Sequence, residues 1–378
     1  MIVYLIAGEA SGDLHASGLM RAMSRRNPEI CFRCFGGDLM REAGGVVVKH
    51  YRDMAFMGFI PVLLNIRKVL NNLKECKKDI LNTRPDAIIL IDYPGFNLKI
   101  AKFVKNYLPD TKVFYYISPK IWAWKRYRIK TIRKYIDKML CILPFETAFY
   151  ETLNYPVQYV GNPSVDAVER YRQTATAEHT ERFRKLTLTD KPILAILPGS
   201  RKAEIADNLP TMLKAAARFP DFQPVIAGAP GMTLDDYKTQ QNHIIIFNQT
   251  YDILNNATVA LVTSGTATLE TALFRLPQVV CYHLSSGKLA NFIFRHFFST
   301  PYISLVNLIA EKKVVKELFG GNFTETNIAS ELNNLINNQL YRSEMLKDYD
   351  RIIIKLGSAG ASDRAAEEIL KNFSEKIL

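Results

Sequence analysis

Cysteines are few in this sequence, and they are scattered along it. Five occur in 378 residues, and the single C-x-x-C pair, Cys31 and Cys34, has no second pair and no histidine cluster nearby. An odd, dispersed set excludes a disulfide framework and argues against a structural zinc site. We therefore expect buried, reduced thiols in a cytosolic protein, and no metal.

Long apolar runs are also missing. No stretch approaches the roughly 18 uncharged residues that a membrane-spanning helix requires. The apolar run at the start, in MIVYLIAGEASGD, spans only a few residues, has no basic region before it and is followed at once by acidic residues. We therefore expect a first β-strand there and not a signal peptide.

Acidic residues are outnumbered by basic ones. Asp and Glu total 37 against 49 Lys and Arg, which gives a net charge of +12. Such an excess indicates an anionic partner, whether nucleic acid, a phosphorylated substrate or an anionic lipid surface. Charge alone does not choose among these three classes.

Strand candidates alternate with helical patterns in two series. They are 2–7, 31–36, 87–91, 113–117, 138–143 and 157–160, then 193–197, 223–227, 244–247, 257–262 and 278–282. This alternation predicts two doubly wound, Rossmann-like α/β domains facing across a cleft, with ligands outside the carboxyl ends of the strands. We place one domain at 1–165 and the other at 166–351. The C-terminal helix, about 352–378, is expected to return to the first domain.

One strand-to-helix junction has the features of a phosphate site. Gly199, Ser200 and Arg201 follow the apolar run in ILAILPGSRKAE, and a helical pattern begins directly after them. A helix N-terminus offers unpaired N–H groups and a positive dipole, glycine permits close approach, and arginine supplies a planar fork for phosphate oxygens.

A second junction carries small hydroxyl residues and one carboxylate. Its residues are Ser264, Gly265, Thr266, Thr268 and Glu270, directly after the strand candidate 257–262. They suit the diphosphate and ribose of a nucleotide. Either junction alone is also typical of an ordinary turn with a Ser or Thr cap, but the two together favour a nucleotide site.

Acidic groups follow two strands of the first domain. The loop GEASGD holds Glu9, Ser11, Gly12 and Asp13 before a helix expected to start near Leu14. Asp92 ends the strand candidate 87–91, where desolvation can raise its pKa and make it a competent base. Helix capping in the loop and turn organisation by Asp92 are the alternative interpretations.

Both tryptophans of the chain lie beside a third strand end. Trp122 and Trp124 occur in SPKIWAWK, and five further cations follow by position 134. Aromatic residues among cations can stack on bases, so a nucleic-acid site and a solvated basic helix face both remain open.

Residues 57–78 form an amphipathic segment. Its apolar side includes Met57, Phe59, Leu63 and Leu64, and its polar side includes Arg67 and Lys68. Such a segment can lie in a membrane interface or simply cover a core. The triplet Asp348-Tyr349-Asp350 lies in a helical run far from the phosphate junction, and we interpret it as a solvated face without metal.

These pieces, in this order, resemble the lipid-A-disaccharide synthases, inverting glycosyltransferases of the GT-B fold. The matching blocks are GEASGD (8–13), FMG (56–58), IDYPGFN (91–97), YYISPKIWAW (115–124), LPFE (143–146), GNP (161–163), LPGSRKAEI (197–205), SGTATLE (264–270) and YISLVNLIA (302–310). The resemblance runs from the first strand to about Phe319. One position departs: Gly95 stands where several members of the family have a second acidic residue.

The resemblance implies transfer of 2,3-diacylglucosamine from its UDP derivative to 2,3-diacylglucosamine 1-phosphate, with no cofactor. The first domain would bind the acceptor and the second the UDP-sugar. Asp92, or Glu9 or Asp13 in the loop, would be the base. Arg201 and helix N–H groups would stabilise the leaving diphosphate, with Glu270 on the ribose and Asn307 helping to bind the nucleotide.

The same resemblance predicts contact with an anionic membrane surface. This contact would be at the cytoplasmic face of the bacterial inner membrane. The residues that would serve the acceptor or the membrane are Ser11, Gly12, Met57, Phe59, Leu63, Leu64, Arg67, Lys68, Trp122 and Trp124. It predicts no nucleic-acid partner and leaves a homodimer open. The alternatives are another GT-B enzyme, such as a UDP-sugar epimerase, and a basic nucleic-acid-binding protein.

Overall fold

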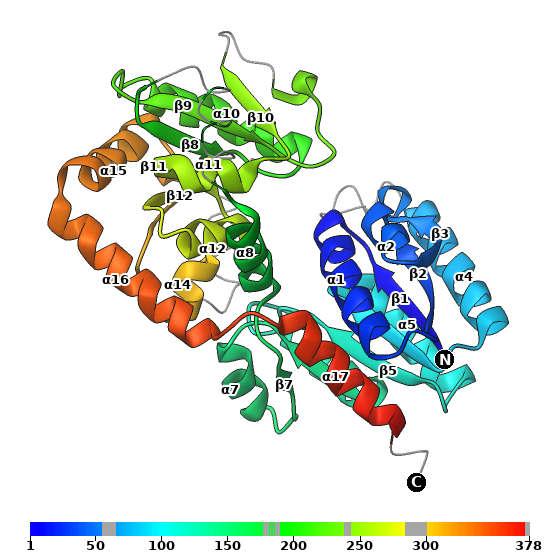
Figure 1. Cartoon of the computed structure of the whole chain (residues 1–378). Coiled ribbons are helices and arrows are strands. Elements are labelled where there is room, and N and C mark those ends of the chain that lie inside the picture. The colour runs from blue at the N-terminus through cyan, green and yellow to red at the C-terminus, as the bar shows by residue number, and fades with distance from the viewer. Residues whose placement is uncertain are drawn as a thin grey trace. The chain divides into compact units, whose positions relative to one another are not determined.

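The computed structural model describes residues 1–54, 66–176, 181, 183, 185, 190–237, 243–283 and 301–374. It divides into two compact units, one made of Met1–Pro163 with Ser358–Leu378 and the other of Ser164–Gly357. Figure 1 shows both units, with labels on many of their elements. The predicted fold class, two doubly wound α/β domains, is confirmed.

The first unit contains a seven-stranded parallel sheet in the order β3-β2-β1-β4-β5-β6-β7. Its strands are β1 (Ile2–Ala7), β2 (Cys31–Gly36), β3 (Gly45–His50), β4 (Ala87–Ile91), β5 (Lys112–Tyr116), β6 (Lys138–Cys141) and β7 (Gln158–Tyr159). The central strands are continuous apolar runs because helices cover both faces of the sheet, and every residue of β4 is buried.

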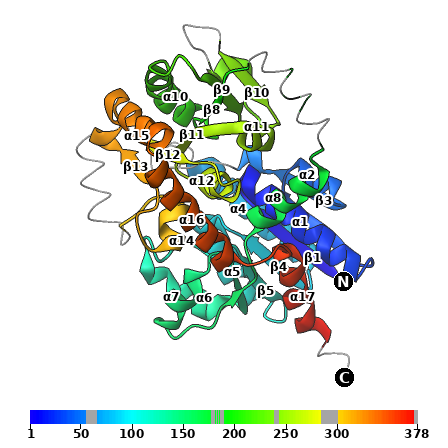
Figure 2. The same ribbon diagram turned by 60° about the vertical axis from the view of Figure 1, so that its left-hand side comes forward.

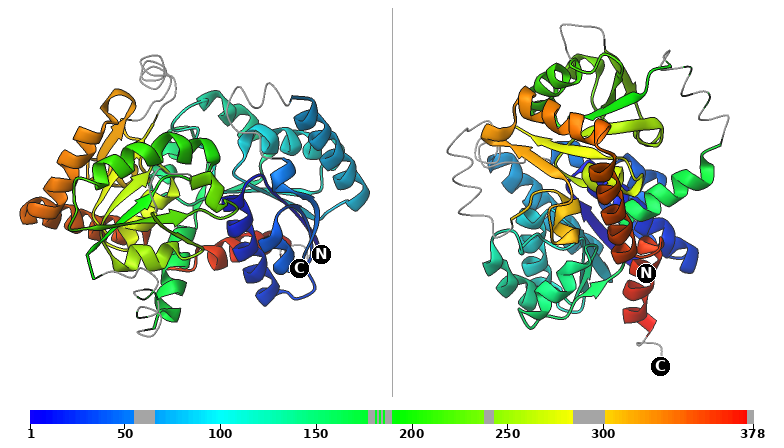
Figure 3. Two further views of the ribbon diagram at one scale, coloured as in Figure 1. Left: turned by 90° about the horizontal axis from the view of Figure 1, so that it is seen from above. Right: turned by 90° about the vertical axis from the view of Figure 1, so that its left-hand side faces the viewer.

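Two groups of helices cover this sheet. They are α1 (Ala10–Arg26), α2 (Asp38–Glu42), α4 (Ile66–Thr83), α5 (Pro94–Tyr107), α6 (Ile129–Tyr135), α7 (Phe145–Glu151) and α17 (Ala361–Ser374). Apolar side chains of α4, α5, α6 and α7 pack on one face, and those of α1 and α17 pack on the other. Further views of the arrangement are given in Figures 2 and 3.

The last helix belongs to the first unit. Asp363 of α17 pairs with Arg25 and Arg26 of α1, and Glu368 pairs with Lys138 of β6. Buried alanines on α17 let it approach α1 closely. The connection from α16 (Gln339–Leu356) passes through Gly357, which has a φ of 76°.

The second unit repeats the architecture with six parallel strands in the order β10-β9-β8-β11-β12-β13. Its strands are β8 (Ile193–Leu197), β9 (Gln223–Gly228), β10 (Ile244–Phe247), β11 (Ala257–Thr263), β12 (Gln278–Tyr282) and β13 (Lys316–Phe319). Its helices are α8 (Pro163–Thr174), α10 (Lys202–Ala216), α11 (Thr250–Asn256), α12 (Thr266–Leu273), α14 (Leu305–Ala310), α15 (Glu325–Asn337) and α16. In each unit the strand order reverses beside the first strand, between β1 and β4 and between β8 and β11. Open α/β sheets bind ligands at such switch points.

Several local predictions differ from the structure. Strands β3 and β13 were not predicted, and α1 begins at Ala10, four residues before the expected start. Of the amphipathic segment, Met57, Phe59, Leu63 and Leu64 lie outside the described residues, whereas Arg67 and Lys68 are exposed on α4. Among the helices that the structure describes, none is long and apolar enough to cross a membrane.

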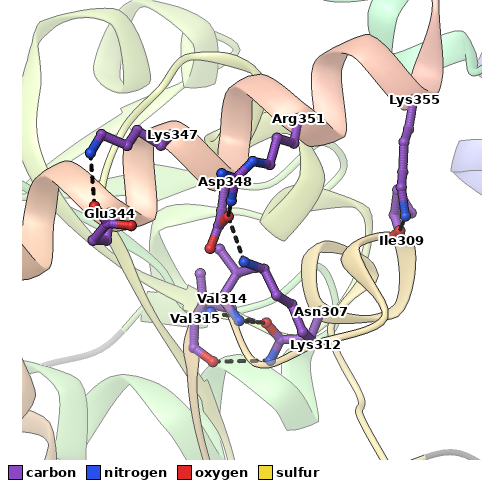
Figure 4. Close-up of polar contacts among 10 residues, drawn as sticks. All are labelled: Asn307, Ile309, Lys312, Val314, Val315, Glu344, Lys347, Asp348, Arg351 and Lys355. Atoms are coloured by element: carbon purple, nitrogen blue, oxygen red, sulfur yellow. Dashed lines mark hydrogen bonds and ion pairs between the residues drawn. The ribbon is translucent and has the colours of Figure 1, made fainter.

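The interpretation of Asp348-Tyr349-Asp350 as a solvated face is wrong. Asp348 is buried and pairs with Lys312 at 2.7 Å and Arg351 at 2.6 Å, as Figure 4 shows. Tyr349 is buried, and Asp350 pairs with Arg275. These residues attach α16 to its own unit, and no cluster of His, Cys, Asp or Glu suited to a metal occurs in the described part of the chain.

Candidate active site

The switch point of the first unit brings two acidic residues to adjacent strand ends. Ala7 of β1 pairs with Ile91 of β4, so Glu9 and Asp92 follow neighbouring strands. The two loops touch, because a Cβ added to Gly8 would lie 2.5 Å from the Tyr93 ring. Burial and then the charge of Glu9 raise the pKa of Tyr93.

Asp92 has an unusual backbone conformation. Asp92 and Tyr93 have φ values of 43° and 47°, so two consecutive non-glycine residues lie in the left-handed region. Such residues cost on the order of 1 kcal/mol or more each and persist only where surrounding contacts impose them, often at functional sites. The contacts here are hydrogen bonds to the Asp92 carbonyl from the Tyr115 hydroxyl at 2.5 Å and the Asn97 amide at 2.7 Å.

The environment of Asp92 favours a general base. Burial raises the pKa of Asp92, while the charges of Lys120 and Arg128 partly offset that effect. Some of the residue remains accessible, since its exposure is intermediate. A carboxylate with a raised pKa that still reaches solvent can accept a proton at neutral pH.

Asp13 is differently engaged. Its side chain is 3% exposed, and its two oxygens accept hydrogen bonds from the backbone N–H groups of Gly37, Leu39 and Met40. These groups form the N-terminus of α2, so Asp13 caps that helix from α1. In the first turn of α1, Ser11 is exposed and Gly12 is buried. A Cβ added to Gly12 would lie 3.1 Å from the Cβ of Ala7, so the space there is tight.

The two tryptophans have different surroundings. Trp122 is buried and donates its indole N–H to Glu146 at 3.1 Å, so it is not available for stacking on a base. Trp124 is 43% exposed, with the Lys125 ammonium 4.0 Å from its ring centre.

Glu146 organises the loop that follows β5. Its buried carboxylate also accepts hydrogen bonds from the Ser118 hydroxyl at 2.5 Å and from the backbone N–H of Leu143 at 3.0 Å. Burial raises its pKa, and these donors oppose the shift. Glu146 thereby fixes the segment that carries Lys120 beside Asp92. Sequence reasoning missed both residues, although LPFE and YYISPKIWAW were among the blocks it noted.

At the switch point of the second unit, the first junction has the geometry of an anion site. Gly199 has a φ of 133°, and a Cβ there would lie 2.6 Å from that of Glu204, so glycine is needed. Arg201 is the N-cap of α10. The Glu204 carboxylate accepts a hydrogen bond from the Ser200 N–H at 3.0 Å and another from the Arg201 guanidinium at 2.5 Å. Both donors therefore converge on one anionic group.

Asn208 holds this junction to its neighbours. Its buried amide donates to the Pro198 carbonyl at 3.0 Å and the Thr263 hydroxyl at 3.2 Å, and accepts from the His283 N–H at 2.7 Å. These three groups follow or end β8, β11 and β12. Asn208 was not predicted as a site residue, because one asparagine within a helical pattern carries no distinctive sequence signal.

The second junction uses several of its hydroxyl groups internally. The Ser264 hydroxyl donates to the Ile303 carbonyl at 3.0 Å, and the Thr268 hydroxyl to the Gly265 carbonyl at 2.8 Å. Thr268 is buried, whereas Gly265 and Thr266 are exposed at the start of α12. The exposed N-terminus of α12 therefore offers backbone N–H groups next to the anion site on β8.

Glu270 lies one turn further along α12. Its carboxylate accepts a hydrogen bond from the Tyr251 hydroxyl of α11 at 2.9 Å. Burial raises the pKa of Glu270, and the Tyr251 hydrogen bond opposes this.

Asn307 is placed for a structural task. It is fully buried, and its amide nitrogen donates to the Val315 carbonyl and to Glu317, while its oxygen accepts from the N–H groups of Val314 and Val315. Its backbone contacts are drawn in Figure 4. Both donors and both acceptor positions of the amide thus have protein partners. Direct contact with a nucleotide would require these bonds to break.

Glu317 links Asn307 to the second junction. It accepts hydrogen bonds from the Ser304 hydroxyl at 2.7 Å and from the Ile303 N–H, and the Ile303 carbonyl accepts from Ser264. Asn307 therefore supports the junction from behind. The block YISLVNLIA marks this segment in the sequence, but the residue types did not reveal which partner each would have.

This chain resembles known proteins over nearly its whole length. A family model described as lipid-A-disaccharide synthetase matches residues 3–373. The lipid-A-disaccharide synthase of Myxococcus xanthus is 37% identical over 98% of this chain and 97% of its own length. That of Syntrophus aciditrophicus is 38% identical over 97% and 96%, and that of Coxiella burnetii 34% over 97% of each.

Solved structures share the fold at low identity. A UDP-GlcNAc 2-epimerase from Neisseria meningitidis has a TM-score of 0.68 and 14% identity, covering 98% of this chain and 100% of its own. The calicheamicin glycosyltransferase CalG4 has a TM-score of 0.58 and 14% identity, with the same coverage. These likenesses confirm a GT-B architecture, and the sequence relatives confirm the predicted resemblance. The chain belongs to the lipid-A-disaccharide synthetase family.

Proposed function

We propose that this protein is an inverting glycosyltransferase of lipid A biosynthesis. It transfers 2,3-diacylglucosamine from its UDP derivative to the 6-hydroxyl of 2,3-diacylglucosamine 1-phosphate, giving a β-1,6-linked disaccharide 1-phosphate and UDP. The observation that carries this proposal is the likeness, over nearly the whole chain, to relatives named lipid-A-disaccharide synthase.

The first unit binds the acceptor, and Asp92 takes the proton from its 6-hydroxyl. The raised pKa, the partial exposure and the imposed backbone conformation of Asp92 support this role. The three backbone donors on Asp13 make that residue a helix cap in preference to a base. Glu9 is the second candidate, since it follows the adjacent strand. One base is sufficient for inversion, because the hydroxyl attacks the face opposite the departing UDP.

The second unit binds the UDP-sugar. The Ser200 N–H, the Arg201 guanidinium and the start of α10 stabilise the negative charge that develops as the diphosphate leaves. The diphosphate competes with Glu204 for the two donors that this carboxylate engages. Gly199 permits its close approach, and Ser264, Gly265, Thr266 and Thr268 shape the opposite junction. Glu270 accepts hydrogen bonds from the ribose, and Asn307 supports the site through Glu317.

The acylated substrates bring the protein to an anionic membrane surface, at the cytoplasmic face of the inner membrane. The outer face of α4 supports this proposal, because Leu70 is 51% exposed among the exposed cations Arg67, Lys68 and Lys74. Trp124 and its neighbouring cations offer a similar combination of an aromatic ring and positive charge.

Mass spectrometry of the products tests the activity. The purified protein is incubated with both acylated monosaccharides, and the expected result is a disaccharide 1-phosphate together with UDP. Omitting the acceptor is the control, because an epimerase would convert the UDP-sugar alone. A changed UDP-sugar without any disaccharide would contradict the proposal.

A further inference from the structure

Tyr251 and Glu270 form a defined pair beside the proposed nucleotide site. The Tyr251 hydroxyl, on α11, donates to Oε1 of Glu270, on α12, over 2.9 Å. Within the described residues, this is the one hydrogen bond that the Glu270 carboxylate accepts. Tyr251 holds the carboxylate from one side, while Glu270 as a whole retains intermediate exposure.

Aromatic packing fixes the Tyr251 ring. It meets Tyr171 of α8 edge to face, with ring centres 5.7 Å apart, and Phe274 at 5.3 Å. Tyr171 and Phe274 also contact each other at 5.5 Å, so the three rings form a closed cluster. Its members rotate little, because each ring is packed by the other two. The hydroxyl of Tyr251 therefore has a fixed direction, which it imposes on the carboxylate.

A ribose makes a specific demand on such a carboxylate. Its 2′- and 3′-hydroxyls are donors. An ionised and correctly turned carboxylate offers an acceptor oxygen to each, whereas the neutral acid has a proton on one of its two oxygens. Burial raises the pKa of Glu270 and favours the neutral form, whereas a hydrogen bond donated by Tyr251 favours the anion. The tyrosine thus supplies the orientation that the diol requires and also favours the ionised form of the carboxylate.

We propose that Tyr251 is a positioning residue that holds Glu270 for the ribose diol of a nucleoside diphosphate, and so gives the site its preference for nucleotides with both hydroxyls. This inference rests on the proposed donor site. Tyr251 itself need not touch the ligand. Its effect is confined to the part of the binding energy that depends on the 2′- and 3′-hydroxyls.

The test compares two probes, UDP and 2′,3′-dideoxyuridine 5′-diphosphate, by calorimetric titration of the full chain. The native protein is expected to prefer UDP by at least roughly tenfold, because a site built to bind hydroxyls rejects the analogue that lacks them. Tyr251→Phe retains the ring and removes the hydroxyl. It is expected to reduce that preference to within about threefold, mainly through weaker UDP binding.

The cluster supplies a matched control. The Tyr171 hydroxyl donates to Asp252 at 2.8 Å, so Tyr171→Phe removes an equivalent tyrosine–carboxylate hydrogen bond from the same three rings without touching Glu270. This variant is expected to keep the native preference. If it loses as much preference as Tyr251→Phe, general loosening of the cluster is responsible and the inference is overturned.

Glu270→Gln separates this inference from the proposed function. If Glu270→Gln loses the preference while Tyr251→Phe keeps it, Glu270 binds the ribose without help from Tyr251, and only the positioning role fails. If Glu270→Gln keeps the preference, the ribose contact itself is wrong and the positioning role fails with it. Failure of the native protein to bind UDP at all would overturn the donor site.

Discussion

The Tyr115 hydroxyl donates a hydrogen bond to the backbone carbonyl of Asp92 across adjacent strand ends, over 2.5 Å. Together with Asn97, it holds Asp92 in a left-handed conformation that a non-glycine residue rarely adopts. The side chain is consequently presented from a backbone that cannot relax into an ordinary turn. This arrangement favours a reactive role for Asp92 over mere turn organisation.

Asp92→Asn tests that role. We expect turnover to fall by about 10² to 10⁴, because loss of a general base acts on the chemical step. UDP affinity should change little, since Asp92 lies in the other unit from the proposed nucleotide site. The measurements are kcat by product formation and Kd for UDP. Glu9→Gln is the matched control, and near-normal turnover of Asp92→Asn with collapse of Glu9→Gln would transfer the role to Glu9.

The pH profile of turnover carries the same information. A base works only when deprotonated, so the rate falls as the pH falls through the pKa of Asp92. Since burial raises that pKa, the acid limb should lie above the ordinary aspartate value of about 3.9. Lys120→Met removes a charge that lowers the pKa, and should move the limb to higher pH. A limb that stays in place would separate Lys120 from the base.

Gly95→Asp tests the position at which the family resemblance predicts a second acidic residue. Gly95 is exposed in the first turn of α5, and a Cβ there would meet no atom within 4 Å. We therefore expect the variant to fold with an unchanged melting temperature. In an Asp92→Asn background, recovery of turnover by at least about tenfold would show that a carboxylate at 95 can serve as base. No recovery would show that a carboxylate at position 95 cannot replace that of Asp92.

The strands were easier to predict from the sequence than the roles of individual site residues. Strands β1, β4 and β8 were predicted to the residue, because buried parallel strands are continuous apolar runs bounded by turn signals. Strand β3 escaped notice, since its residues are only partly buried and its register shifts.

Individual roles in the site were less predictable, because they depend on tertiary partners that the local sequence pattern does not specify. Asp13 caps a helix 24 residues away, and Asn307 is saturated by a loop that begins seven residues later. Neither partner can be inferred from spacing. The sequence around Trp122 allowed an exposed ring that stacks on bases. In the structure its indole is buried and donates a hydrogen bond to Glu146, a partner that the sequence did not indicate.

Arg201→Ala tests the anion site of the second unit. Loss of a charge-assisted contact with phosphate should weaken UDP binding by at least about tenfold and slow turnover. Lys202→Ala is the control, because this neighbouring cation pairs with Asp236 at 2.8 Å. Titration calorimetry gives both affinities. If the two variants weaken UDP binding equally, Arg201 contributes only its general positive charge and makes no specific contact with phosphate.

Removal of divalent metal tests the metal-free mechanism. Activity should survive excess EDTA, and a strict need for a divalent metal would contradict the mechanism.

The outer face of α4 is tested with vesicles. Arg67→Gln, Lys68→Gln and Leu70→Ser together should reduce partitioning onto vesicles rich in anionic phosphatidylglycerol by at least about tenfold, since each cation near such a surface contributes roughly 1 kcal/mol. Leu340→Ser removes an even more exposed leucine from α16 and should have no effect. Cosedimentation measures the bound fraction. If the triple variant binds vesicles as well as the native protein, α4 makes no contact with the membrane and only covers the core of its unit.

Glu146→Gln tests the support of the loop that carries Lys120. The carboxylate accepts hydrogen bonds from a serine, an indole and two backbone N–H groups, and a glutamine would direct its own NH₂ donors at some of them. Leaving buried donors without acceptors should lower the free energy of unfolding by about 2 to 4 kcal/mol. Chemical denaturation followed by tryptophan fluorescence measures this, because Trp122 is one of the four partners. Glu151→Gln, an exposed change on the same helix, is the control. Turnover should fall as well, because Lys120 would lose its fixed place beside Asp92. Native stability and native turnover of Glu146→Gln would show that the loop does not need this support.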